Sequence, residues 1–192
     1  MKNFKLYLED YVLLTEATDV VQIKPGHVLI SDYVKQHISS HNDIGIGSVF
    51  NKNVDMELIS NAAKQAPVAD DGGAYTVTAP GIGYNLVLPI DEALSLPDAE
   101  QTTVVKDERG QEIEVPAVKT SANIDQFATD QLTVIIRPSN PDYLPDDVKN
   151  DPEILQAIEN NESYSILTAF PGDPNIPPAS EWNNQFAVIL PS

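Results

Sequence analysis

The sequence predicts an α+β fold in which N-terminal helices pack on a mostly antiparallel sheet. Helical patterns come early in the chain and strand patterns dominate later, an order typical of α+β proteins. Fifteen prolines against nine glycines favour extended segments broken by turns over a helical bundle. Hydrophobic residues make up 42% and charged residues 21% of 192 residues, which suits one domain over residues 1–192 with its own core.

Two helices are clear from their apolar spacing. Val54–Gln65 carries an apolar stripe and can be capped by Asn53 or Asp55. Pro152–Asn160 begins with proline in its first turn, after Asp151 as the cap. A shorter helix is expected at about residues 30–39.

Strands are expected wherever β-branched or aromatic runs are bounded by Gly, Pro, Asn or Asp. Val105–Gln111 should form the turn of a hairpin, with Gly110 where a positive φ is wanted, and this hairpin could protrude as an acidic flap. The expected strands are Tyr75–Thr78, Tyr84–Pro89, Thr102–Val105, Glu112–Lys119, Leu132–Arg137, Tyr164–Phe170 and Phe186–Leu190.

The net charge of −18 comes from 29 acidic and 11 basic residues. Residues 1–66 hold 8 acids and 6 bases, residues 67–137 hold 12 and 4, and residues 138–192 hold 9 and 1. A uniform basic surface for nucleic acid is therefore excluded. Solubility is the simplest interpretation of the surplus acid. The absence of cysteine excludes disulfides, cysteine zinc sites and thiol catalysis.

Targeting and membrane segments are not expected. Residues 1–16 carry charges through their apolar positions and lack a small-residue cleavage site, so they do not form a secretory signal. The longest uncharged run, Gly72–Ile90, is broken by prolines and glycines and cannot be a membrane helix. We expect a cytoplasmic protein, or one delivered as part of a larger system, with no membrane partner.

All three histidines, His27, His37 and His41, fall within fifteen residues. Imidazole is the side chain best suited to proton transfer near neutral pH. On a helix, His37 and His41 would share a face at a spacing that also suits zinc, although no motif places a third ligand. Ordinary surface histidines near a helix end are the alternative interpretation.

Five short segments in order carry a family resemblance. They are Gly26-His27-Val28, Ser48-Val49-Phe50, Gly81-Ile82-Gly83-Tyr84, Leu132–Arg137 and Tyr164-Ser165-Ile166-Leu167-Thr168-Ala169-Phe170-Pro171. With these segments the sequence resembles the RNase A-like toxin domains of bacterial contact-dependent inhibition proteins, within the barnase–EndoU–colicin–RelE-like nuclease group. The resemblance covers about residues 26–172, with insertions near 91–130 and 138–162, and its most specific part is the closing strand.

The resemblance implies metal-independent cleavage of RNA without a cofactor, in a toxin-type nuclease encoded by a phage or mobile element. His27 would take the proton from the ribose 2′-OH, and His37 would act as the acid or replace an arginine found in the family. Thr168 would contact the phosphate. The family often has tyrosine at the position of Phe170. The residues expected to bind substrate are Lys35, Ser48 and Phe170.

Because a chain of charge −18 should bind RNA weakly, an active nuclease could need a partner protein that supplies a basic surface, and a partner could also neutralise the enzyme. Two alternatives to the nuclease stay open. In the first, the fold has lost catalysis and serves as an acidic module that binds or inhibits another protein; in the second, His37 and His41 form a metal-dependent site.

Overall fold

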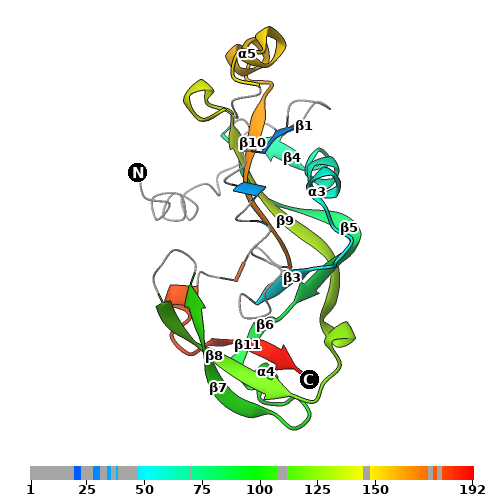
Figure 1. Cartoon of the computed structure of the whole chain (residues 1–192), viewed down its shortest axis with the longest axis vertical. Helices are drawn as coiled ribbons and strands as arrows, with labels where there is room; N and C mark the ends of the chain where they lie inside the picture. Colours follow the sequence, from blue (N-terminus) through cyan, green and yellow to red (C-terminus); the bar gives the residue numbers. More distant parts are fainter. Residues whose placement is uncertain are drawn as a thin grey trace. The chain divides into compact units, whose positions relative to one another are not determined.

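The computed structural model describes residues 20–22, 28–30, 34–35, 38, 47–69, 71–107, 112–144, 148–172, 175–176 and 179–192 (Figure 1). Within these ranges the chain is predominantly β, and its helices are short. Two helices have eight residues and one has four: α3 (Met56–Ala63), α5 (Pro152–Glu159) and α4 (Ile90–Ala93). The prediction of N-terminal helices packed on a mostly antiparallel sheet is therefore wrong.

The physical reason is that early segments of the chain join strands from its middle and end. Each of the two larger sheets contains a parallel pair. One pair is β2 (Val28–Leu29) with β10 (Tyr164–Pro171), and the other is β8 (Glu112–Thr120) with β11 (Phe186–Pro191). Such pairing joins residues far apart in sequence, and local periodicity does not report it.

The five-stranded sheet has the order β2-β10-β9-β5-β3. Tyr164 of β10 lies opposite Val28 of β2 in a parallel pair, whereas Phe50 of β3 lies opposite Gly83 of β5 in an antiparallel pair. Its strands are β2 (Val28–Leu29), β3 (Ser48–Phe50), β5 (Gly73–Asn85), β9 (Ala128–Pro138) and β10 (Tyr164–Pro171). A separate two-stranded sheet pairs β1 (Val20–Gln22) with β4 (Pro67–Ala69).

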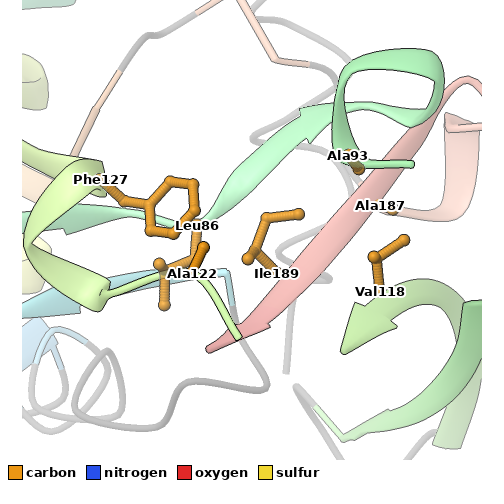
Figure 2. Close-up of a cluster of buried hydrophobic side chains, with 7 residues drawn as sticks. All are labelled: Leu86, Ala93, Val118, Ala122, Phe127, Ala187 and Ile189. Atoms are coloured by element: carbon orange, nitrogen blue, oxygen red, sulfur yellow. The ribbon is translucent and has the colours of Figure 1, made fainter. Parts of the chain in front are cut away.

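The four-stranded sheet has the order β6-β11-β8-β7. Neighbouring residues of β11 belong to different apolar clusters, because successive side chains of a strand point to opposite faces. Ile189 packs in a cluster with Phe127 (Figure 2), whereas Val188 packs in a cluster with Trp182. The strands are β6 (Val87–Pro89), β7 (Glu100–Asp107), β8 (Glu112–Thr120) and β11 (Phe186–Pro191). Three 3₁₀ turns are η3 (Ile124–Phe127), η4 (Pro141–Tyr143) and η5 (Ala179–Glu181).

The chain divides into two compact units, each assembled from separated segments. The first unit comprises Met1–Gln36, Asp55–Val77 and Thr133–Ala169. The second comprises His37–Val54, Thr78–Leu132 and Phe170–Ser192. The prediction of one domain over residues 1–192 stays a prediction.

The predictions of individual helices and strands agree with the structure better than the prediction of the fold class does. The two clear helices are confirmed as α3 and α5, with Asp55 and Asp151 accepting hydrogen bonds from backbone N–H groups of their first turns. Of the shorter helix expected near 30–39, Val34, Lys35 and Ile38 are helical. Six of the seven expected strands lie within observed strands, and the seventh, Tyr84–Pro89, covers the end of β5, Leu86 outside any strand, and all of β6.

The expected hairpin is also confirmed. β7 and β8 pair antiparallel from Glu100 opposite Lys119 to Asp107 opposite Glu112. Residues 108–111 of its turn lie outside the described residues.

Candidate functional site

The closing segment of the family resemblance forms a strand within the five-stranded sheet. β10 lies between β2 and β9. Tyr164 and Ile166 are each 1% exposed, whereas Leu167 is half-buried. The expected strand Tyr164–Phe170 is confirmed, and it lies inside the sheet rather than at its edge.

Thr168 lies on the buried side of this strand, and its side chain is 8% exposed. Its hydroxyl oxygen is the only buried side-chain polar atom without a hydrogen-bond partner among the described residues. A buried hydroxyl without a partner destabilises a fold by about 1–3 kcal/mol, so native proteins contain few of them. A structural role of Thr168 in capping a turn would have given the hydroxyl a backbone partner. Among the described residues, nothing therefore supplies a hydrogen-bond partner for this buried hydroxyl.

The residues just before and just after β10 each make a backbone hydrogen bond. Ser139 N donates to Ser163 O at 2.9 Å, and Gly172 N donates to Gln131 O at 3.0 Å. Within β10 the alternating burial breaks at Thr168 and Ala169, which are both buried.

The other predicted site residues have different environments. Ser48 is 8% exposed on β3, Phe170 is half-buried on β10, and Lys35 is exposed. Thr168 and Lys35 belong to the first unit, whereas Ser48 and Phe170 belong to the second. The three histidines, His27, His37 and His41, lie outside the described residues, so the meeting of His27 or His37 with Thr168 stays a prediction.

A chain of three serine hydroxyls at the start of β10 was missed by the sequence analysis. Ser163 Oγ donates to Ser139 Oγ at 3.0 Å, and Ser139 Oγ lies 2.9 Å from Ser165 Oγ. Ser139 is 7% exposed and accepts from Ser163, so its own proton is best satisfied by donation to Ser165. The half-buried Ser165 hydroxyl then remains as a free donor. The only signal of this series of hydroxyls in the sequence is that serines occur next to the end of one expected strand and at the start of another.

The charged side chains are almost all at the surface. Every acidic side chain whose burial the structure describes is exposed, except the half-buried Glu162. Within the described ranges, no group of three or more His, Asp or Glu residues could hold a metal ion. None of the helices in the same ranges is long and apolar enough to cross a membrane.

Comparison with known proteins gives no family. No protein-family model matches the chain, and no curated protein matches it. Among solved structures, the chain is similar to the crystal structure of a conserved hypothetical protein from Toxoplasma gondii ME49. The TM-score is 0.34 at 10% sequence identity, over 88% of this chain and 97% of that one.

Proposed function

We propose that the chain is a ribonuclease-like domain that cleaves RNA without a metal ion, by attack of the ribose 2′-OH on the adjacent phosphorus. One observation carries this proposal. The motif that contributes most to the family resemblance is a largely buried strand, and its candidate phosphate ligand, Thr168, has a hydroxyl without a partner among the described residues. An unpartnered hydroxyl could donate a hydrogen bond to a non-bridging phosphate oxygen.

The proposed roles follow the chemistry of 2′-OH attack. His27 is the base that removes the 2′ proton, and His37 is the acid or the cation that stabilises the developing negative charge. Lys35, Ser48 and Phe170 are the proposed contacts to the RNA strand. The requirement for a 2′-OH spares DNA.

An RNA cleavage assay with and without EDTA tests this function. Cleavage should survive EDTA and leave 2′,3′-cyclic phosphate ends. His27→Ala should lower the rate by roughly 10²–10⁴, the span of a general acid or base. His41→Ala is the matched control because His41 has no role in the proposed mechanism, and it should retain the wild-type rate. Cleavage that disappears in EDTA, or that needs His41 rather than His27, would support the metal-dependent alternative.

A second candidate function is a catalytically silent acidic module that binds a basic protein. The exposure of nearly all described carboxylates favours it, because surface charges of one sign speed association with an oppositely charged partner. Salt-sensitive binding to polylysine, together with RNA left intact by wild type and His27→Ala alike, is its expected signature. RNA cleavage that depends on His27 would reject the silent module.

A further inference from the structure

The outer edges of the four-stranded sheet differ greatly in length. β6 forms one edge with three residues that end in Pro89, whereas β7 forms the other with eight residues and no proline. Within the described part of the chain, β8 is the only strand paired with β7. About every second residue of such an edge strand directs its N–H and C=O away from the sheet, so β7 has main-chain groups to offer a further strand.

The middle of β7 lacks the features that usually prevent strand addition. Gln101–Val105 contains no charge, glycine or proline and is rich in β-branched residues. All eight residues of β7 pair with β8 on its inner side, and Val104 packs against the cluster that contains Val115. The edges of the five-stranded sheet, β2 and β3, have only two and three residues. β7 is therefore the longest of the described strands that stand outermost in a sheet.

Acidic residues outnumber basic residues in the hairpin that contains this edge. Glu100 at the start of β7 and Glu114 on β8 are both exposed. Asp98, just before β7, accepts a hydrogen bond from Ser121 Oγ at 2.6 Å, which fixes its carboxylate near the strand. Residues 98–120 hold six acids against three bases, one of which, Lys119, lies opposite Glu100. This charge attracts cationic side chains and repels a second copy of the same chain.

We propose that β7 is a docking edge that receives an extended, lysine- or arginine-containing segment of a partner protein as an added strand. Main-chain hydrogen bonds to β7 provide the attachment, and the carboxylates of Asp98, Glu100 and Glu114 select cationic side chains. The inference does not depend on the proposed ribonuclease function.

The test uses the full chain and a fluorescent peptide of alternating lysine and valine. A second peptide is identical except that alternate backbone nitrogens are methylated, which removes the N–H donors along one edge. In the protein, Thr103→Lys places a cation in the middle of β7 at an exposed position. Thr76→Lys is the matched control, because Thr76 is exposed on β5, a strand of the five-stranded sheet rather than of the sheet that contains β7, and the charge change is the same.

Thr103→Lys and backbone methylation should each weaken binding by at least about tenfold, whereas Thr76→Lys should change it little. Equal binding of the methylated peptide, or equal binding by Thr103→Lys and Thr76→Lys, would reject the docking edge and indicate non-specific charge attraction. No binding of the unmethylated peptide would also reject it. RNA cleavage by the same samples, measured in parallel, reports the ribonuclease function separately.

Discussion

Replacing Thr168 with valine should stabilise the protein. Valine keeps the shape of threonine and replaces its hydroxyl with a methyl group. Because the Thr168 hydroxyl is buried without a partner, its removal relieves an unfavourable term of about 1–3 kcal/mol. For a chain of this length, each kcal/mol corresponds to a rise of about 2–4 °C in Tm.

Thr120→Val is the matched control with the opposite expected sign. Thr120 is 4% exposed, its hydroxyl donates to Pro97 O at 2.6 Å, and it accepts from Ala122 N at 3.1 Å. Valine there leaves Ala122 N–H without its partner and removes one donor from Pro97 O, which keeps the bond from Ser121 N, so it should lower the free energy of unfolding by about 1–3 kcal/mol.

Urea unfolding followed by far-UV circular dichroism measures both variants, because it reports the strands of both units. Trp182, the only tryptophan, lies in the second unit, so its fluorescence alone would not follow Thr168 in the first. A loss of more than about 1 kcal/mol in Thr168→Val would refute the reasoning, since it would show that the hydroxyl has a stabilising partner.

The same variant separates stability from activity. If Thr168 contacts phosphate, Thr168→Val should unfold at higher urea and yet cleave RNA roughly 10–10³ times more slowly, because a lost hydrogen-bond donor to developing charge has an effect of this order. Thr168→Ser, which keeps the hydroxyl, should recover most of the cleavage rate. A stabilised variant with unchanged cleavage would remove Thr168 from the proposed mechanism.

Three further predictions concern the fold. Ile166→Ala should lower the free energy of unfolding, measured in urea, by roughly 2–5 kcal/mol, and Leu167→Ala should lower it by less because Leu167 is only half-buried. A larger loss in Leu167→Ala than in Ile166→Ala would contradict the observation that Ile166 is the buried side chain of β10. Asp151→Ala should remove the cap of α5 and lower the stability by about 0.5–2 kcal/mol in thermal unfolding, whereas no change would show that the cap is dispensable. Gly83→Ala should lower it by at least about 1–3 kcal/mol and speed hydrogen exchange in β3, because a Cβ there would overlap Val49 O; wild-type exchange would argue against the close approach.

The strands could be predicted because their residues alternate or are strongly β-branched between clear turn signals. β8 and β11 are examples, since each carries apolar side chains on both faces of its sheet. β1, β2, β3 and β4 have only two or three residues, too few to show a period. The order of strands in the sheets was unpredictable for another reason. β10 and β11 are the parallel partners of β2 and β8. Each lies far from its partner in sequence, so only tertiary packing selects the pairing.

Less of the candidate site than of the fold could be predicted. The sequence singles out Thr168 from its place in a motif, but it gives no sign that the hydroxyl is unpartnered, because that depends on the strand beside it. The hydroxyl chain of Ser139, Ser163 and Ser165 was missed for the same reason: residues separated by more than twenty positions meet only where β9 and β10 pair. The contribution of His27 and His37 stays a prediction.

The position of β11 between β6 and β8 has a consequence for protein synthesis. The β7–β8 hairpin is complete once residue 120 has been made, but its inner neighbour, Phe186–Pro191, is translated much later. At about 5–20 residues per second, the delay is roughly 3–13 s. Until then, the backbone groups of β8 that later pair with β11 have no partner, and the apolar side chains of β8 are exposed while the chain is still on the ribosome. This protein should therefore depend on chaperones during translation, and a pause between codons 120 and 186 should lower its soluble yield more than a pause elsewhere.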